Sequence, residues 1–246
     1  MNPTIGFPVL LAAIAQIAFG GGVLSNETDG KMTSKYQDPL MVIFGASYAG
    51  GWGEPDLHGW RVINRGVSGD ETSGMLARFD ADVVAEQPDA VLIWGFINDI
   101  FRSERNTVEE KLTQTRSNFK ALVVRARAAG VMPILATEVP IRHKKSFMSE
   151  FQQVVGRVLR KKSYQMYINS FVHRENEWLR SFAKSQCVSL LDLSNALSDE
   201  DGYRIRSYSA DDGSHISPEG YKALSLYAAA HRKAMRIETS DSSECE

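Results

Sequence analysis

The sequence predicts an α/β fold in which helices cover both faces of a mostly parallel, five-stranded sheet. Five short apolar runs recur along the chain, and each is typical of a buried parallel strand. Segments with helical spacing of apolar residues alternate with these runs. The length of 246 residues is sufficient for one substantial core.

The predicted strands are rich in β-branched residues and are bounded by polar or turn-forming residues. The first, "PLMVIFG", ends in Gly45, which stops the apolar run. The five strands are predicted at 39–45, 61–64, 89–96, 132–139 and 188–193. No internal repeat interrupts this order, so we expect a single domain over 39–237.

The predicted helices have recognisable start or stop signals. They span 72–87, 107–129 and 218–237. Pro88 follows the first helix and Gly130 follows the second, and both residues end helices. Ser217 at the N-cap followed by Pro218 at the first helical position is a well-matched start for the third.

The composition is that of a globular protein without a strong charge bias. Hydrophobic residues make up 43%, charged residues 24%, and the formal net charge is -2. Without a basic field, nucleic acid is not an expected partner. The two cysteines are too few for a disulfide framework and show no metal-ligand spacing, so we expect no metal and no cofactor. Cys187 precedes an apolar run and is predicted to be buried.

The two ends of the chain lie outside the predicted domain. Residues 5–24 form an uncharged apolar stretch long enough to span a bilayer, within an N-terminal segment of residues 1–31. Three interpretations remain open: an export signal, a retained anchor, or a translation start at Met32 that removes the segment. Export to the periplasm or the medium is the favoured interpretation; a start at Met32 predicts a cytoplasmic protein. The acidic tail, 238–246, is predicted to be disordered.

Residues 142–164 form a strongly basic segment with one acid, Glu150. Its apolar residues lie on one helical face, which predicts an extra helix. One interpretation is a surface helix whose apolar face packs on the core. The alternative is a lid or docking helix for an anionic substrate or a membrane surface. The N-terminal segment is the other candidate for membrane contact.

The loops after the strands contain residues suited to nucleophilic catalysis, since ligands bind at the carboxyl edge of such sheets. Ser47 follows the first strand, and a serine needs a base to accept its proton. His215 can supply that base, and Asp212, three residues earlier, can orient the ring. The alternative for this loop is an acidic turn that favours the start of the last helix.

Two further loops offer donors for the negative charge that develops on a carbonyl oxygen during acyl transfer. Gly69 follows the second strand and offers its backbone N–H. Asn98 follows the third strand and offers its side-chain amide. Alone, the first is also typical of a flexible turn and the second of a helix cap. Four such stretches at four predicted strand ends favour a common site.

With these residues the chain resembles the SGNH hydrolases, also called GDSL esterases or lipases, over roughly 40–232. The four name-giving residues match Ser47, Gly69, Asn98 and His215, and Asp212 matches the Asp-x-x-His block. The resemblance implies a three-layer α/β/α sandwich. It also implies that Ser47 is the nucleophile and that His215, oriented by Asp212, is the base and then the acid. The N–H groups of Ser47 and Gly69 and the Asn98 amide would form the oxyanion hole.

The sequence departs from the family pattern at three places. Ala46 replaces the Asp of Gly-Asp-Ser, which is not a member of the triad. The block that ends in Asn98 is one residue longer than in the family. The first crossover, 50–60, is too short for a full helix, and we expect Trp52 or Trp60 near an open pocket.

The predicted function is a metal-independent ester hydrolase that acts through an acyl-serine intermediate. Its partner would be a small acyl ester; sugar esters, lysophospholipids and acyl thioesters are all candidates. Two alternatives use the same residues. One is an acyltransferase, in which an alcohol replaces water, and the other is a binding module that has kept the pocket without the reaction.

Overall fold

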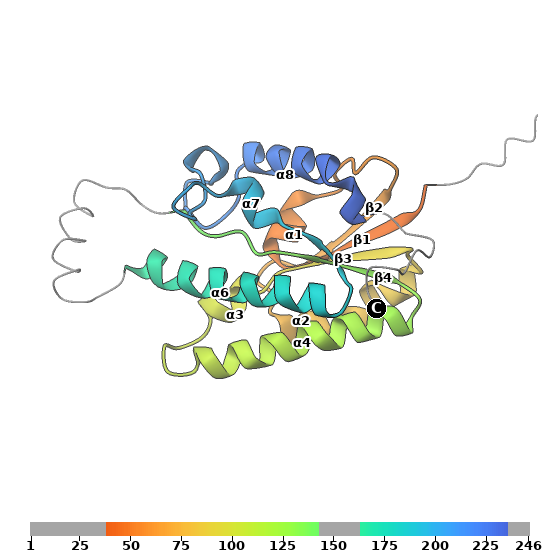
Figure 1. Ribbon diagram of the computed structural model, residues 1–246, viewed down its shortest axis with the longest axis horizontal. Helices are drawn as coiled ribbons and strands as arrows, with labels where there is room; N and C mark the ends of the chain where they lie inside the picture. Colours follow the sequence, from red (N-terminus) through yellow and green to blue (C-terminus); the bar gives the residue numbers. More distant parts are fainter. Residues whose placement is uncertain (1–37, 143–162, 236–246) are drawn as a thin grey trace, which may run out of the picture. The chain divides into compact units, whose positions relative to one another are not determined.

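A computed structural model of the chain describes residues 38–142 and 163–235, which form a three-layer arrangement around one sheet (Figure 1). The five strands are all parallel and lie in the order β2-β1-β3-β4-β5. They span Leu40–Gly45 (β1), Arg61–Gly66 (β2), Ala90–Trp94 (β3), Met132–Ala136 (β4) and Ser189–Leu191 (β5). The predicted parallel sheet is confirmed.

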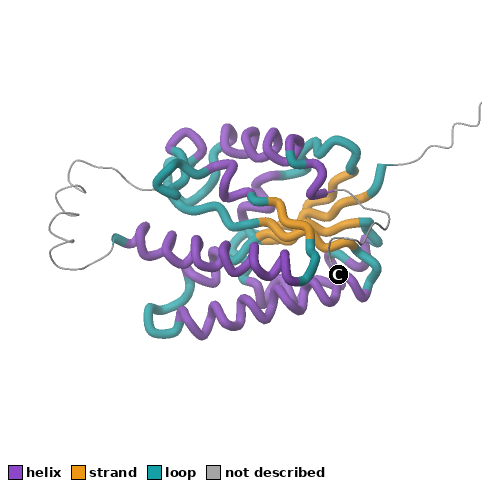
Figure 2. The backbone as a smooth tube through the Cα atoms, viewed as in Figure 1, coloured by secondary structure: helices purple, strands orange, loops and turns teal. Residues whose placement is uncertain are grey.

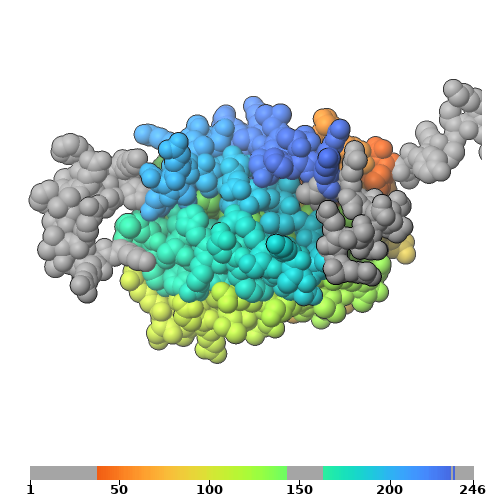
Figure 3. Space-filling model, in the orientation of Figure 1, coloured from red at the N-terminus to blue at the C-terminus, as the bar shows by residue number. Residues whose placement is uncertain are grey.

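Helices cover both faces of the sheet, and Figure 2 shows the strands enclosed between them. On one face lie α1 (Ser47–Trp52), α7 (Leu193–Leu197) and α8 (Pro218–Ala230). On the other lie α2 (Thr72–Asp82), α3 (Ile97–Phe101), α4 (Val108–Ala128) and α6 (Tyr164–Ser185). Short 3-10 turns follow at Val84–Glu86 (η1), Arg206–Tyr208 (η2) and Arg232–Met235 (η3). The predicted three-layer α/β/α sandwich is confirmed, and Figure 3 shows the same view of the surface, with α8 at the top and α6 and α4 below it.

The two central strands bring the first and third loops together. Residues 41–44 of β1 and 90–94 of β3 are fully buried, as continuous apolar runs predict. Gly45 pairs with Trp94, and a Cβ on Gly45 would lie 1.7 Å from the Trp94 carbonyl oxygen. Only glycine permits this close approach. The chain order also reverses between β1 and β3, which is where ligands bind in sheets of this kind.

Several element boundaries differ from the prediction for local reasons. The helix predicted over 72–87 ends at Asp82, where Val83 has φ -119°, and the short turn η1 then ends at Gln87, directly before Pro88. The helix predicted over 218–237 ends at Ala230 and is followed by η3. Cys187 was predicted to be buried and is exposed, in a turn with φ 48°.

The first crossover contains a helix of one and a half turns, α1, which ends at Gly53. The expectation that Trp52 lies near an open pocket is wrong. Trp52 is 6% exposed, and its Nε1 donates to Ser225 Oγ at 3.0 Å. It packs edge-on against Trp94 in the core, because α8 covers this short crossover.

Three predicted segments lie outside the described residues. These are the N-terminal segment 1–31, the basic segment 142–164 apart from its ends, and the tail 238–246. Across 38–142 and 163–235, no helix is both long and apolar enough to cross a bilayer.

Candidate active site

The loops that carry the predicted site residues all follow carboxyl ends of strands or precede α8. Ser47 is the first residue of α1, directly after β1. Gly69 lies in the loop after β2, and Asn98 is the second residue of α3, after β3. Asp212 and His215 lie in the loop that leads into α8.

Asp212 and His215 form a hydrogen-bonded pair. His215 Nδ1 lies 2.5 Å from Asp212 Oδ2, and Asp212 Oδ1 accepts the backbone N–H groups of Ser214 and His215 at 2.7 and 2.8 Å. Partial burial opposes ionisation of Asp212, but these hydrogen bonds hold the pKa of its carboxyl well below the usual range. The contact at Nδ1 leaves Nε2 as the nitrogen available for proton transfer.

The loop of His215 is fixed against the start of α1 through Tyr48, the residue after Ser47. Tyr48 OH donates to the Ser214 carbonyl at 2.5 Å, and the rings of Tyr48 and His215 meet edge-on with centroids 6.4 Å apart. Ser47 and His215, far apart in sequence, therefore lie at the same edge of the sheet. Among the described residues no hydrogen bond joins their side chains, and such catalytic contacts often shorten only with substrate.

Gly69 and Asn98, the residues predicted for the oxyanion hole, are connected through Asp70. Asn98 Nδ2 donates to the carbonyl of Asp70 at 2.7 Å, which leaves its second N–H available. Gly69 has φ 77°, and a Cβ there would lie 2.8 Å from Arg102 Nη2. The positive φ favours glycine at this position. Ser47 is the first residue of α1, and N–H groups at this position have no acceptor within their own helix.

Asp99 holds this side in place from the core. Its carboxylate accepts from the Thr72 N–H at 3.0 Å, Thr72 Oγ1 at 2.6 Å and Thr115 Oγ1 at 2.8 Å. Burial raises the pKa of Asp99, and the bonds from both threonines oppose the rise. Because Asp99 follows Asn98 directly, it fixes α3 against the start of α2 and thereby fixes the Asn98 amide.

The first departure from the family pattern, Ala46, fits its surroundings. Ala46 is 2% exposed, and a Cβ on Gly95 would lie 3.1 Å from the Ala46 Cβ. A carboxylate at this position would be buried against the β3 loop and would be costly without a partner.

The second departure, the longer block before Asn98, is explained by Glu138, which follows β4. Glu138 is fully buried, and its Oε2 accepts the N–H groups of Phe96 at 2.6 Å and Ile97 at 3.1 Å. These are the two residues between Gly95 and Asn98, so the carboxylate holds the additional backbone. Burial raises the pKa of Glu138 to about 7, against the effect of these N–H groups and of Arg204.

Arg204 is a second buried charge beneath the site. It is 1% exposed, and its Nε donates to the Pro140 carbonyl at 2.9 Å. Its Nη2 donates to Tyr48 OH at 2.7 Å and to the Ser214 carbonyl at 2.6 Å. The sequence analysis singled out neither Arg204 nor Glu138. Glu138 carried a usable signal, an acid at the end of an apolar strand, whereas Arg204 lies in a polar turn that resembles any solvated loop.

A pocket of about 420 Å³ adjoins the triad loop. Its lining includes Phe101, Ile141, Arg142, Tyr164, Asp212 and Ser214. A larger hollow of about 620 Å³ lies between α4 and α6 and contains none of the predicted site residues. Within the described ranges, no group of His, Cys, Asp and Glu side chains is arranged to hold a metal ion.

Comparison with known proteins places the chain among acylhydrolases. The model of the GDSL-like Lipase/Acylhydrolase family matches residues 39–223. An acetylxylan esterase of Geobacillus stearothermophilus is 46% identical over 48 residues, which are 20% of this chain and only 22% of that protein. An uncharacterized lipoprotein of Bacillus subtilis, YqeF, is 25% identical over 175 residues, 66% of this chain and 70% of that protein.

Solved structures share the fold at low sequence identity. An acetyl xylan esterase from Geobacillus stearothermophilus, Axe2, superposes with a TM-score of 0.59 at 20% identity, covering 82% of this chain and 97% of that one. A GDSL-like lipase from Bacteroides thetaiotaomicron superposes with a TM-score of 0.59 at 19% identity, covering 80% and 88%.

Proposed function

Because the chain belongs to the GDSL-like lipase/acylhydrolase family, we propose that it is a serine ester hydrolase that cleaves small acyl esters through an acyl-serine intermediate. The observation that supports this most is the contact between the two ends of the chain. Tyr48, next to Ser47, donates to Ser214, next to the His215 that is hydrogen-bonded to Asp212. This contact supports the proposal that Ser47 and His215 act as nucleophile and base at one site.

In the proposed first half-reaction, His215 Nε2 takes the proton of Ser47 as Oγ attacks the ester carbonyl carbon. The carbonyl π electrons move to the oxygen, which accepts hydrogen bonds from the N–H groups of Ser47 and Gly69 and from Asn98. When the tetrahedral intermediate collapses, the bond to the alcohol breaks and the imidazolium protonates the leaving alcohol. Asp212 stabilises the imidazolium throughout.

In the second half-reaction a water molecule takes the place of the alcohol. It loses a proton to His215 and attacks the acyl carbon, and the acid is released as Ser47 Oγ regains the proton. In the pair of His215 and Asp212, 55% and 48% of the respective side chains are exposed. This exposure favours attack by water over attack by a bound acceptor alcohol. Hydrolysis is therefore preferred over acyl transfer.

The substrate range of the proposal is small acyl esters, with acetylated carbohydrate as the first class to test. An acetylxylan esterase is among the relatives in both sequence and fold. Lysophospholipids and acyl thioesters are the next classes to assay. The lipoprotein relative agrees with the proposal that the protein is exported. Membrane contact through 142–164 or the N-terminal segment stays a prediction, for which liposome binding is the test.

The decisive experiment compares Ser47→Ala with Ser73→Ala, an exposed serine on α2. We expect Ser47→Ala to lose at least about 10³-fold in kcat on nitrophenyl acetate and to escape labelling by a fluorophosphonate. Ser73→Ala should behave as the parent protein does. A Ser47→Ala protein that keeps its activity contradicts the proposal, and an unlabelled, inactive parent protein indicates the binding module instead. Product analysis with added alcohols separates hydrolysis from transfer.

A further inference from the structure

Arg204, Tyr48 and Glu138, here called the Arg204 cluster, connect the loops that carry the proposed site residues. Arg204 donates to Tyr48 on α1 and to Ser214 in the triad loop. It also donates to Pro140, two residues after Glu138. Glu138 in turn accepts the two N–H groups that precede Asn98. The cluster thus includes the sequence neighbour of Ser47 and contacts the sequence neighbours of His215 and Asn98, without including any of these three residues.

The cluster is a poor arrangement for stability alone. Arg204 is 1% exposed, yet it donates to two carbonyls and a phenol and to no carboxylate in the described chain. Its Nη1 has no hydrogen-bond partner within the same residues. Even a buried ion pair can often be replaced by well-packed apolar residues at no cost in stability, and Arg204 lacks the attraction that such a pair provides. A fold would therefore gain little from keeping it unless its geometry serves another purpose.

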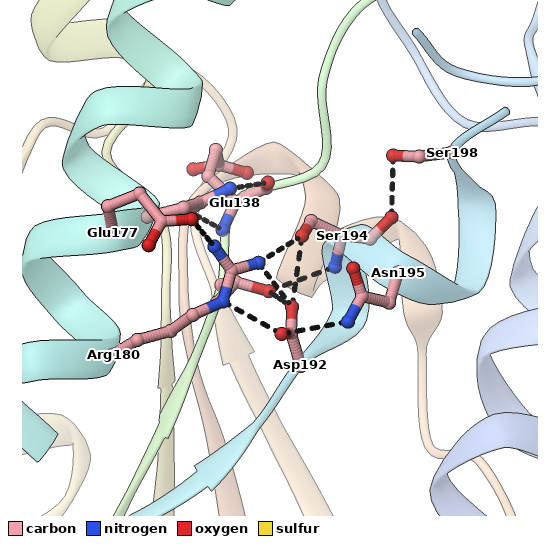
Figure 4. A network of polar contacts seen from close by, with 9 residues as sticks. Glu138, Glu177, Arg180, Asp192, Ser194, Asn195 and Ser198 are labelled. Atoms are coloured by element: carbon pink, nitrogen blue, oxygen red, sulfur yellow. Dashed lines mark hydrogen bonds and ion pairs between the residues drawn. The ribbon is translucent and has the colours of Figure 1, made fainter. Parts of the chain in front are cut away.

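Arg180 provides a contrast at the same edge of the sheet (Figure 4). Its guanidinium binds both oxygens of Asp192, at 2.8 and 3.0 Å, and also contacts Glu177 and Ser194. These contacts join α6, β5 and α7, and none of these partners is adjacent to a predicted site residue. Arg180 is thus a paired charge that supports the fold.

We propose that Arg204 is a positioning residue for catalysis: through Tyr48 and the Ser214 carbonyl it sets the approach of His215 to Ser47. The inference rests on the proposed function. It requires a planar side chain that reaches three acceptors in different directions, which the guanidinium provides and an ammonium does not. A small displacement of the triad loop is costly to proton transfer but leaves the ester-binding surface unchanged.

The test compares Arg204→Lys and Arg204→Gln with Arg180→Lys and Arg180→Gln. For Arg204→Lys we expect kcat to fall at least about tenfold while KM changes less than about twofold, with a parallel fall in the rate of fluorophosphonate labelling. Arg204→Gln should lower kcat further than Arg204→Lys does. The Arg180 variants should unfold at lower temperature and keep kcat. If Arg204→Gln does not fold, Tyr48→Phe removes the shared hydroxyl and should lower kcat in the same manner.

Unchanged kcat in Arg204→Lys and Tyr48→Phe would overturn the inference, as would an equal loss of kcat in Arg180→Lys. An active Ser47→Ala protein would instead contradict the proposed function. The two failures are distinguishable because the second does not depend on any Arg204 variant.

A second inference comes from cations at the rim of the site that have no carboxylate partner. Arg142 lines the 420 Å³ pocket beside the triad, and its guanidinium would lie 3.6 Å from a Cβ on Gly213. Arg102 lies over Gly69. Neither guanidinium forms an ion pair within the described ranges, whereas Arg65, Arg78, Arg116, Arg174 and Arg180 each pair with a carboxylate there. Asp212 is the acid that lines the pocket, and its charge is engaged by His215.

We infer that the preferred ester carries an anionic group, bound beside the triad by Arg142 with Arg102 adding to the field. This inference narrows the substrate of the proposed function. Charges at the rim of a site act mainly on the rate at which the substrate binds. We therefore expect the two arginines to raise kcat/KM for an anionic ester, and we expect this effect to weaken as salt is added. A neutral ester of the same shape gains nothing from the two arginines.

Two matched substrate pairs test this: monomethyl glutarate against methyl valerate, and 3-acetoxypropionate against propyl acetate. In each pair a carboxylate replaces a methyl group, on the acyl side in the first and on the alcohol side in the second. We expect the anionic member of at least one pair to have the higher kcat/KM at low salt. Arg142→Gln should lower that ratio by about fivefold or more, and Arg102→Gln by less.

Arg232→Gln is the matched control, because Arg232 is exposed and remote from the pocket lining. It should leave the ratio unchanged. Preference for the neutral ester in both pairs, or a ratio that survives Arg142→Gln, would overturn the inference while leaving the esterase function intact. A protein that cleaves none of the four esters contradicts the proposed function and this inference together.

Discussion

The two sides of the candidate site are built in opposite ways. On the oxyanion side, Asn98 is followed by Asp99, whose side chain is buried and receives two hydrogen bonds from Thr72 at the start of α2 and one from Thr115 within α4. On the triad side, Asp212 and His215 are about half exposed and belong to a loop. The proposed donor Asn98 is thus held by a buried neighbour, whereas the proposed base lies in a half-exposed loop. Substitutions should therefore affect stability and activity together on the first side and activity alone on the second.

The largest expected effect tests the exposed side. His215→Ala removes the base, and we expect kcat on nitrophenyl acetate to fall at least about 10³-fold. Its free energy of unfolding should change by less than about 0.5 kcal/mol, because the side chain is 55% exposed and makes one hydrogen bond of consequence, to Asp212. Urea denaturation and initial rates on the same preparation give both numbers. A large loss of stability would mean that the triad loop is part of the core after all.

The next effect tests the buried side. Asp99→Ala leaves the Thr72 N–H and the Thr72 and Thr115 hydroxyls without their acceptor, so we expect a loss of roughly 3 kcal/mol or more in the free energy of unfolding. Activity should fall as well, by about tenfold, because α3 and the Asn98 amide lose their support. Asp99→Asn keeps one acceptor oxygen, so its stability and activity should lie between those of the parent protein and of Asp99→Ala. Full activity in a destabilised Asp99→Ala protein would show that Asn98 is held by Asp70 alone.

The contrast also explains how far the sequence could predict the site. Ser47, Gly69, Asn98 and His215 follow from strand ends and from the chemistry that acyl transfer demands, and the resemblance to a family assigns their roles. Asp99 is next to one of them. Glu138 was missed because the strand was predicted over 132–139 and therefore included it, although β4 ends at Ala136.

Arg204 shows a different limit of sequence reasoning. It lies in "DEDGYRIRSY", where polar composition and the absence of any period are typical of a solvated loop. Its burial depends on Tyr48 and Pro140, which are far away along the chain and meet it only in the folded sheet. The fold itself, by contrast, follows from local patterns, since each strand is a short apolar run and most helices show apolar residues at helical spacing. The start of α6 at Tyr164 was not predicted, because the helix predicted for the basic segment 142–164 runs up to this residue.

The smallest expected effect is on how folding stability changes with pH, and it distinguishes the buried Glu138 from the exposed Asp212. Burial raises the pKa of Glu138 to about 7 from an ordinary value near 4.5, and the groups facing it are the N–H groups of Phe96, Ile97 and Val139 and the more distant Arg204 and Tyr48. Between these two values the folded state binds more protons than the unfolded state, so stability is complete at low pH and declines as pH rises toward 7. The decline is on the order of 3 kcal/mol, and the raised pKa of Asp99 acts in the same direction.

Glu138→Gln should remove most of this decline, because glutamine keeps an acceptor for the Phe96 and Ile97 N–H groups without a titrating proton. Thermal unfolding of the parent protein and the variant, measured every half unit from pH 5 to 8.5, gives the comparison. We expect the parent midpoint to fall by several degrees over this range and the variant to follow a flatter curve. Asp212→Asn is the control from the triad side: the lowered pKa of the Asp212 carboxyl keeps it ionised throughout this range, so the slope of the parent should persist. Parallel curves for the parent and Glu138→Gln would show that the buried carboxylate stays ionised, with Arg204 close enough to hold its charge.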